Sequence, residues 1–335
     1  MSRIPLSAPF IPALPENKLR PLWSVMIPVY NCIQFLEETL RSVLGQCLPE
    51  SEMQIEVVDD ASTDGNVEEM VAAVGKGRIG YFRQPENVGS IRNFETCIIR
   101  AGGYRIHLLH GDDKIRMGYY EKMNELFKKY PEAGAAFCRF INIDDKGAKC
   151  GKQPPESIAD TLLPNWFPKI ASYQRIQYCA ITVKREVYEK LGSFYALTYA
   201  EDWEMWVRAA KHYAFAYTPE ILAEYRKHLQ SISGTKFSDA QYLRDLQYAM
   251  QLIQIHVHEK DRKKILSRSK KFYAHYAVKT AEQLHDLSYS KKAVNNSIVA
   301  GTGMHKDLHL YYKIAKLYIK MYARKLLSPK SKIGQ

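Results

Sequence analysis

Short apolar runs alternate with amphipathic segments in the first third of the chain, and this alternation restricts the possible folds more than any other feature. Strand–helix–strand repeats of this kind predict a parallel sheet covered by helices, which is an α/β fold. The predicted strands span residues 23–31, 54–60, 78–84 and 105–113, and the predicted helices between them span residues 33–46, 67–75 and 90–103.

Polar side chains follow each of these four predicted strands. The strings are YN (30–31), DDASTDG (59–65), PENVGSIRN (85–93) and HGDDK (110–114). The carboxyl ends of parallel strands share one edge of a sheet, where loops can carry polar groups and ligands collect. A protein with a purely structural role has little reason to concentrate polar residues there, so we expect a ligand site at this edge.

Two adjacent carboxylates, Asp112 and Asp113, end the fourth predicted strand. Like charges side by side repel, so the pair is stable only where solvent, a cation or a hydrogen-bonding ligand neutralises it. The rest of the sequence has to distinguish these three possibilities.

The rest of the chain departs from simple alternation. The first twenty residues carry prolines at positions 5, 9, 12 and 15 and predict an extended arm outside the core. After residue 118 we predict, in order, a helix (119–130), a strand (135–140), an irregular stretch (144–177), a strand and short helix (178–192), a helix (200–212), a returning pair of strands (215–228) and helices almost throughout beyond residue 238.

Composition limits the class of protein. The chain is 46% hydrophobic, which supports a substantial core, and it contains no apolar run of about 18 residues that would mark a membrane span. The N-terminus lacks the pattern of a secretory signal, so we expect a cytoplasmic protein. The six cysteines form no C-x-x-C pair, which argues against disulfides and against a zinc site.

The net charge of +12 is concentrated near the C-terminus. From His258 onward, 18 Lys and Arg face 5 Asp and Glu, or +13, whereas the remainder carries 30 against 31, or −1. A basic end indicates an acidic partner surface, either anionic lipid or nucleic acid. Residues 308–327 suit a basic amphipathic helix on an anionic membrane, with packing on the rest of the protein as the alternative. No nucleic-acid motif accompanies the charge, so we expect no nucleic acid.

Six strings occur in a characteristic order and on the predicted strand ends. They are PVYN (28–31), VVDDASTD (57–64), ENVGSIRN (86–93), LLHGDD (108–113), AEDWEMWVR (200–208) and YRKH (225–228). Together they resemble the family 2 glycosyltransferases, and the resemblance covers residues 23–233.

The resemblance implies a GT-A fold, the Rossmann-like fold of nucleotide-diphospho-sugar transferases, with a helical C-terminal extension. We expect an extended arm over residues 1–21, a GT-A domain over 22–235 with a donor-nucleotide half (22–113) and an acceptor half (114–235), and a basic helical region over 236–335.

The implied activity is inverting transfer of a sugar from a nucleotide-sugar donor, expected to be UDP-linked, to a hydroxyl of a glycan or lipid-linked acceptor. Surface polysaccharide or glycolipid synthesis is the expected process, in the cytoplasm and peripherally at the inner face of the plasma membrane. The alternative is a catalytically silent nucleotide-sugar-binding or scaffold subunit of a glycan assembly complex. Such a subunit would typically lack Asp113 or Asp202, and both are present. The donor sugar, the linkage and the oligomeric state stay open.

The resemblance also assigns the carboxylate pair. A divalent cation held by carboxylates can stabilise the charge that develops on a departing diphosphate. The family places Asp112 nearer the donor ribose and Asp113 on the metal, with His228 as a further ligand. Oxygen ligands favour Mn²⁺ or Mg²⁺ over zinc. His110 stands where many members have an acid, and it is either a strand-end residue bonded to a neighbouring backbone or a ligand.

Donor contacts carry over to Pro28, Tyr30, Asn31, Asp59, Asp60, Asn87, Gly89, Arg92, Asn93, Asp112 and Arg226. An ionised acid such as Asp60 suits the imide N–H of uracil. Several residues also have simpler interpretations. Tyr30 could stack under the base or pack in the core, and Ser62, Thr63 and Asp64 are predicted to cap the following helix. Arg92 would meet the pyrophosphate or pair with an acid at 59, 60, 112 or 113. Arg226 and His228 would close the donor site or face solvent.

The catalytic base implied by the resemblance is Asp202, with Glu201 adjacent. Transfer to an alcohol in one displacement needs a group that takes the acceptor proton. The competing interpretation is that these acids only complement the positive end of a helix. Trp203 and Trp166 are the candidate acceptor contacts, because aromatic faces often line sugar sites.

Overall fold

The structure is a computed structural model that describes residues 2–15, 19–228, 231, 236 and 240–327. The chain divides into two compact units. The first comprises residues 1–170 and 174–228, and the second comprises residues 171–173 and 229–335. The boundary expected between residues 235 and 236 adjoins a stretch, 232–235, that lies outside the described residues.

Four parallel strands open the sheet of the first unit. They are β1 (Trp23–Val29), β2 (Met53–Asp59), β3 (Gly80–Arg83) and β4 (Arg105–Leu108). β1 pairs in parallel with both β2 and β4, and β2 pairs in parallel with β3. Every residue of β1 is buried, because a strand covered on both faces cannot alternate between apolar and polar side chains. The predicted parallel sheet is therefore present.

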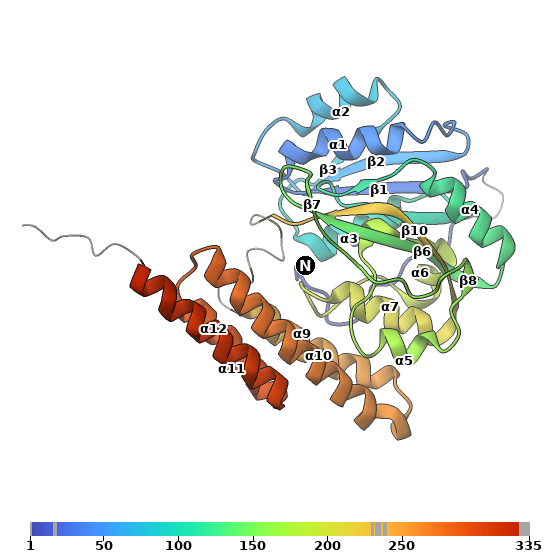
Figure 1. The fold of residues 1–335 in the computed structure, drawn as a ribbon. Coiled ribbons are helices and arrows are strands. Elements are labelled where there is room, and N and C mark those ends of the chain that lie inside the picture. Colours follow the sequence, from blue (N-terminus) through green and yellow to red (C-terminus); the bar gives the residue numbers. More distant parts are fainter. Residues whose placement is uncertain (1, 16–18, 229–230, 232–235, 237–239, 328–335) are drawn as a thin grey trace, which may run out of the picture. The chain divides into compact units, whose positions relative to one another are not determined.

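Three helices connect these strands, namely α1 (Ile33–Leu44), α2 (Val67–Gly75) and α3 (Ser90–Arg100). α1 and α2 lie on one side of the parallel strands, and α3 lies on the other (Figure 1). Each helix buries a stripe with helical spacing; in α1 it includes Phe35, Leu36 and Leu40. Parallel connections through helices bring all four strand ends to one edge.

The second half of the first unit extends the sheet with antiparallel and parallel pairs. Its elements are β5 (Lys114–Ile115), α4 (Tyr119–Lys129), β6 (Ala133–Ile143), the 3₁₀ turn η1 (Tyr178–Ala180), β9 (Ile181–Lys184), α6 (Arg185–Leu191), α7 (Glu201–His212) and β10 (Ala214–Arg226). β9 pairs antiparallel with β4 and β6, whereas β6 and β10 are parallel. The resulting order is β3-β2-β1-β4-β9-β6-β10-β5.

Two predictions for this half were wrong. The stretch 144–177 contains β7 (Lys149–Lys152), β8 (Thr161–Leu162) and α5 (Trp166–Ile170), whose strands pair with β6 and β10. The partner of β8 lies far along the chain, so local patterns do not reveal it, whereas β7 forms a hairpin with β6 through the turn at residues 144–148. The predicted returning pair of strands is the single strand β10. Pro219 and Glu220 resemble a turn, but register shifts between Thr218 and Ala223 absorb them without reversing the chain.

The start of α2 also differs from the prediction. Asn66 caps this helix by accepting a hydrogen bond from Glu69 N at 3.1 Å. Of the three residues predicted to cap it, Asp64 instead accepts from Ile33 N at 2.9 Å, at the start of α1. Ser62 accepts from Asn31 N at 3.1 Å. The loop after β2 is thereby fastened to the loop after β1.

The N-terminal arm, residues 2–15 in the described chain, has no helix or strand there, as its prolines predict. It is nevertheless packed on the first unit, because Pro5 and Ile11 are buried. Its proline carbonyls accept hydrogen bonds from the body of the unit: Pro5 O from Ala196 N, Pro9 O from Ser193 N and Pro12 O from Arg185 Nη2, at 2.8, 3.0 and 3.1 Å. An extended chain without internal hydrogen bonds leaves these carbonyls available.

The second unit consists mainly of helices, as predicted beyond residue 238. They are α9 (Gln241–His256), α10 (Glu259–Asp286), α11 (Lys291–Met304) and α12 (Leu308–Leu327). α10 packs against the other three, and a Cβ at Gly301 of α11 would lie 3.0 Å from Ala274 O of α10. Among the described helices, none combines the length and apolar character needed to cross a membrane.

Candidate active site

The carboxylate pair lies just beyond β4, and the end of β10 encloses it. Asp113 is buried and its Oδ1 accepts from Arg226 N at 2.8 Å, whereas the Asp112 side chain is 21% exposed and its Oδ2 lies 2.9 Å from His228 Nε2. Arg226 is itself buried, donating to Asp112 O at 2.8 Å and to Glu38 Oε2 at 3.1 Å. Neither residue at the end of β10 faces solvent, so that interpretation of Arg226 and His228 was wrong.

The two acids differ in their electrostatics. Burial and the charge of Asp112 raise the pKa of Asp113 well above its ordinary value. Burial is the largest single influence on Asp112 and acts to raise its pKa, but the hydrogen bond from His228 and the electrostatic effects of His110 and His228 together outweigh it, so that the pKa lies below its ordinary value. The pair therefore favours a single negative charge, on Asp112. Ionisation of Asp113 as well requires a nearby positive charge.

A divalent cation fits this pair. His110, Asp112 and Asp113 each offer one ligand atom, and these atoms lie within 4.8 Å of one another. A cation there would compensate the second carboxylate charge that burial disfavours. His110 packs between Phe94 and Tyr178, with ring centroids 5.0 and 4.3 Å away, and burial lowers its pKa to about 4. It is thus a neutral imidazole near pH 7, available as a nitrogen ligand.

Tyr178 connects the carboxylate pair to the acids of α7. Its ring contacts His110, and its hydroxyl donates to Glu201 Oε1 at 3.1 Å. Asp202 follows Glu201 at the first turn of α7, and both are 8% exposed. The predicted metal motif and the predicted base are therefore joined through one buried aromatic side chain.

Asp202, the predicted base, is buried and has an elevated pKa. Burial and the neighbouring Glu201 charge raise its pKa well above the ordinary value, against a hydrogen bond from Trp203 N to Oδ1 at 2.7 Å. The Gln174 side chain also acts to lower this pKa. Acids that only complement a helix dipole would be exposed and would favour the charged form. The raised pKa instead suits proton acceptance.

The acids after β2 are engaged by the protein. Asp60 accepts from Val88 N and Gly89 N at 2.7 and 3.0 Å, which fixes the loop before α3. Asp59 accepts from Ser62 N and Tyr81 Oη, each at 2.9 Å, and pairs with Arg83. Both carboxylates thus organise the loops where the donor contacts are predicted.

Other predicted donor residues lie around the same loops. Tyr30 is 51% exposed, so it is not a packed core aromatic, and Asn31 Oδ1 accepts from Thr63 N at 2.8 Å. Asn87 Nδ2 donates to Asp60 O at 3.2 Å. Asn93 is buried and donates to Val58 O at 2.9 Å, and Pro28 is buried within β1.

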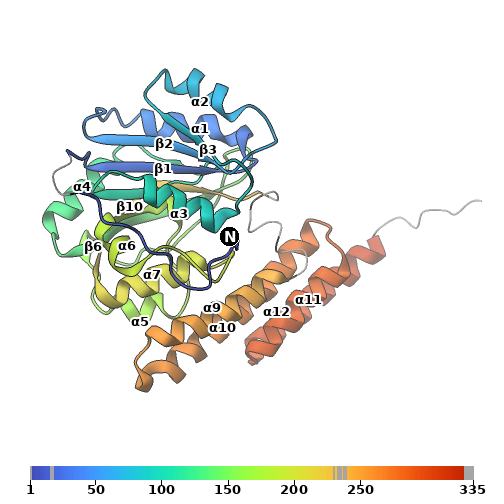
Figure 2. The ribbon, with the colours of Figure 1, turned by 180° about the vertical axis from the view of Figure 1, so that it is seen from behind.

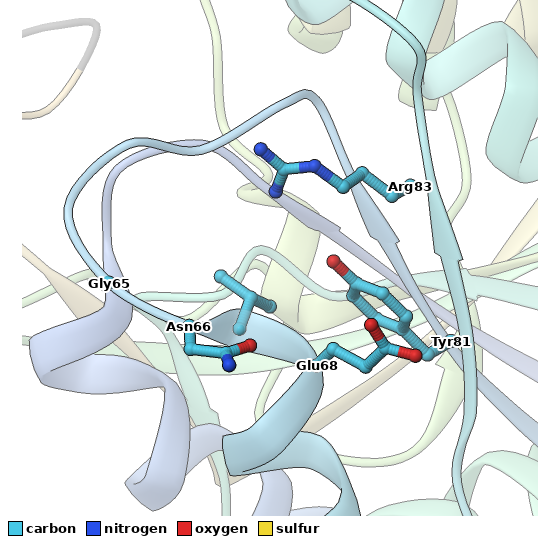
Figure 3. A pocket seen from close by; sticks show the side chains of 6 residues that line it. Gly65, Asn66, Glu68, Tyr81 and Arg83 are labelled. Atoms are coloured by element: carbon cyan, nitrogen blue, oxygen red, sulfur yellow. The ribbon is translucent and has the colours of Figure 1, made fainter.

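A cavity of about 360 Å³ opens beside these loops at the end of β3. Arg83, Tyr81 and Glu68 extend toward it in Figure 3, and Asn66 lies across from them. Tyr81 and Arg83 both contact the Asp59 carboxylate, so that acid borders the lining.

Three predicted residues have positions that the motifs did not indicate. Arg92 pairs with Glu95 at 2.6 Å and donates to Ser2 O at 3.0 Å, and it pairs with none of the four acids considered for it. Trp203 is fully buried and donates to Ile170 O at 2.6 Å, while Trp166 is 5% exposed among core aromatics. Neither ring has an open face.

The motifs also missed three residues that hold the site together. Tyr178 gives no local signal except its place before a strand. Thr39 is a polar residue on the apolar stripe of α1, and its hydroxyl donates to Gly111 O and Asp113 O at 3.0 and 2.7 Å. Glu38, the preceding residue of α1, forms ion pairs with Arg226 and Lys114. A hydroxyl on an apolar stripe was the signal available for Thr39.

Comparison with known proteins identifies the family. The sequence model described as Glycosyl transferase family 2 matches residues 24–199. The chain is a family 2 glycosyltransferase. Its relatives include a putative teichuronic acid biosynthesis glycosyltransferase, TuaG of Bacillus subtilis, which is 30% identical over 227 residues covering 66% of this chain and 85% of TuaG. An uncharacterized glycosyltransferase of Rickettsia prowazekii is 25% identical, covering 69% of this chain and 72% of that protein.

Solved structures show that this glycosyltransferase has the GT-A fold. TarS of S. aureus, in complex with UDP-GlcNAc, matches with a TM-score of 0.60 at 14% identity, covering 84% of this chain and 90% of that one. The mannosyltransferase PcManGT from Pyrobaculum calidifontis, in complex with GDP-Man and Mn²⁺, matches with a TM-score of 0.57 at 17% identity, covering 94% and 84%. The expected fold class is confirmed.

Proposed function

We propose that this enzyme transfers a sugar from a nucleoside-diphosphate donor to a hydroxyl of a surface polysaccharide or glycolipid precursor, with inversion at the anomeric carbon. The observation that carries the proposal is the continuous path of contacts from Asp112 and His110 through Tyr178 to Glu201 and Asp202. It joins a cation-binding group to a buried base at the edge where donor loops meet.

In the proposed reaction, Asp202 accepts the proton of the acceptor hydroxyl while that oxygen attacks the anomeric carbon. The new carbon–oxygen bond forms as the bond from that carbon to the diphosphate oxygen breaks, and the electron pair leaves with the nucleoside diphosphate. Attack opposite the leaving group inverts the centre. The raised pKa of Asp202 makes its carboxylate a stronger base than an exposed acid.

His110, Asp112 and Asp113 would hold the divalent cation, with His228 orienting Asp112 through their hydrogen bond. When bound, Mn²⁺ or Mg²⁺ supplies positive charge for the departing diphosphate. Arg226 fixes both acids, since its backbone N–H binds Asp113 and its side chain binds Asp112 O. The Mn²⁺ in the PcManGT complex supports this cofactor.

For the donor we propose a UDP-sugar. The TarS complexes with UDP-GlcNAc and UDP support this class, while PcManGT binds GDP-Man. We propose that the process is glycan synthesis, which agrees with the name of TuaG, and that it takes place in the cytoplasm.

A panel of nucleotide sugars tests the proposal. Thermal unfolding is measured with Mn²⁺ and each donor, because a ligand of the folded state raises the melting temperature. We expect a UDP-sugar to raise it and then to release UDP when a hydroxyl acceptor is added, with an inverted product by NMR. The proposal fails if no nucleotide sugar stabilises the protein.

We further propose that α12 binds an anionic membrane surface. Leu310, Ile314 and Leu317 bury one side of this helix within the second unit. The opposite side exposes an aromatic and apolar stripe with helical spacing, consisting of Leu308, Tyr311, Tyr312, Tyr318, Ile319 and Tyr322. Lys313, Lys316, Lys320 and Arg324 lie on the same helix. Exposed tyrosines bordered by cations are typical of interfacial helices.

Liposome co-sedimentation tests this surface. We expect the full chain to bind vesicles that contain anionic lipid and to lose most of that binding in the double variant Tyr312→Ser, Ile319→Ser. Neutral vesicles should bind neither protein. Equal binding by both proteins would contradict the assignment.

A further inference from the structure

The first residues of the N-terminal arm lie beside the loop before α3, where donor contacts are predicted. Figure 2 shows the dark blue arm running past α6 and α7 toward α3. Ser2 O accepts from Arg92 Nε at the first turn of α3, and Arg3 Nη2 donates to Asn87 Oδ1. The arm thus connects the loop before α7, which precedes the proposed base, with the loop before α3.

Arg3 is in close contact with Gly89. A Cβ added at Gly89 would lie 3.1 Å from Arg3 Nε, and Gly89 already has a φ of 88° that favours glycine. The charge of Arg3 also affects the pKa of Asp60. Burial raises this pKa, while the amides of Val88 and Gly89 and the positive charge of Arg3 act to lower it. Arg3 therefore belongs to the same cluster as the predicted base-recognition acid.

Three other arginines of this edge are paired with acids. Arg83 pairs with Asp59, Arg92 with Glu95 and Arg226 with Glu38. In the part of the chain that the structure describes, the exposed Arg3 makes its side-chain hydrogen bond to a neutral amide oxygen and has no carboxylate within 4.0 Å. A guanidinium has five N–H donors, so most of them stay available for an anion.

We propose that Arg3 is a donor-binding residue, which the arm supplies to the nucleotide site to attract and hold the nucleoside diphosphate. This inference rests on the proposed function. Three proline carbonyls and two buried side chains anchor the arm, so little ordering is required when the nucleotide binds. The family motifs do not contain this residue, because it lies outside the matched range of 24–199.

Calorimetric titration of UDP in the presence of Mn²⁺ tests the role of Arg3 in the full chain. We expect Arg3→Ala to raise the Kd about threefold to tenfold, with no change in melting temperature, because it removes a charge-assisted contact to the diphosphate. Arg3→Lys should retain part of the affinity. The difference from the native protein should shrink as salt is raised, since the charge is exposed.

Arg41→Ala is the matched control. Arg41 is an exposed arginine of the same unit that pairs with Glu37 on α1, and its loss should leave the Kd unchanged. Unchanged or tighter UDP binding by Arg3→Ala would overturn the inference, and tighter binding would mean that the arm shields the site. If the native protein binds neither UDP nor GDP with Mn²⁺, the proposed function fails and the inference fails with it.

Discussion

Glu201 and Asp202 show how one residue sets the chemistry of its neighbour. The two carboxylates are buried at the start of α7, and the charge of Glu201 is a cause of the raised pKa of Asp202. Tyr178 holds Glu201 in place through its hydroxyl. The elevated pKa of the proposed base thus depends on a residue that need not touch the acceptor.

Glu201→Gln should shift the pH dependence of transfer. Removing the Glu201 charge lowers the pKa of Asp202 toward its ordinary value, so the base stays ionised to lower pH. The acidic limb of kcat/KM should therefore move to lower pH, while the maximal rate falls because Asp202 becomes a weaker base. A pH profile of UDP release measures this, and a limb that stays in place or moves upward would contradict the coupling.

His107 should make stability depend on pH. It is fully buried in β4 beside Tyr120, and burial lowers its pKa to about 3. An unfolded histidine titrates near pH 6.5, so between about pH 3 and 6.5 the unfolded state binds more protons and stability falls as the pH is lowered.

His107→Gln keeps a polar partner for the Tyr120 hydroxyl and cannot titrate. Its free energy of unfolding should decline less steeply between pH 6 and pH 4, by up to about 1.4 kcal/mol per pH unit. Urea unfolding at a series of pH values gives both slopes. Equal slopes for the two proteins would contradict this prediction, because they would mean that folding does not lower the pKa of His107.

Asp112→Asn should weaken metal binding. Asp112 carries the more exposed carboxylate of the pair and has the lowered pKa, so it is ionised at neutral pH. We expect at least about tenfold weaker Mn²⁺ binding in the presence of UDP, because a charged oxygen ligand becomes neutral. The EPR signal of free Mn²⁺ measures this. Asp160→Asn, which removes an acid paired with Lys122, should bind Mn²⁺ normally.

At the scale of elements, the N-terminal arm is fixed by close approach to a glycine. Gly192, after α6, has a φ of 77°, and a Cβ there would lie 2.7 Å from Pro9 O and 2.9 Å from Ala8 Cβ. Gly77 has a similar φ of 86° with nothing within 4 Å of the added Cβ. Gly77 therefore serves as a control with a positive φ and no steric overlap at the added Cβ.

Gly192→Ala should therefore destabilise the protein more than Gly77→Ala. Gly192 has a φ of 77° and a ψ of 178°, a backbone region that costs about 1–3 kcal/mol for a residue with a Cβ, and overlap with the arm adds about 1–3 kcal/mol. Hydrogen exchange should also become faster in residues 2–12 of Gly192→Ala only. Similar unfolding free energies for the two variants would show that the arm is loosely held.

Local patterns predicted the elements that local interactions define. α2 spans residues 67–75 as expected, and the parallel strands β1 to β4 follow from apolar runs between polar loops. β8 was missed and β10 was split because pairing between distant segments decides them, and the β7 strand of the hairpin with β6 and the short helix α5 were missed as well. The arm was recognised from its prolines, but its burial depends on carbonyl partners around residues 185–196.

The motifs located the candidate site but not the direction of each side chain. Asp112 and Asp113 are adjacent, yet one is partly open and the other is enclosed by Arg226. Trp203 was placed near the acceptor by its position after Asp202, whereas its ring is buried. Tyr178, which connects the two groups of acids, belongs to no motif. Such orientations depend on tertiary packing, which a linear pattern does not encode.

At the scale of the whole molecule, the candidate active site and the net positive charge lie in different units. The first unit carries the carboxylates and the family match, whereas the net positive charge comes from residues 258 onward. A basic unit that binds an anionic membrane would hold the enzyme near a lipid-linked acceptor without changing the donor site. Lipid binding and donor binding should therefore be separable by mutation.

The central claim is that one donor site, built on the carboxylates after β4, is served by Asp202 as the base. The most direct test compares Asp202→Asn with the native enzyme for UDP binding and for sugar transfer. Asp261→Asn, which removes a first-turn acid from α10, controls for helix-dipole effects. We predict native UDP affinity and a loss of transfer of about 10²–10⁴-fold for Asp202→Asn only. Turnover by Asp202→Asn equal to that of the native enzyme would contradict the account.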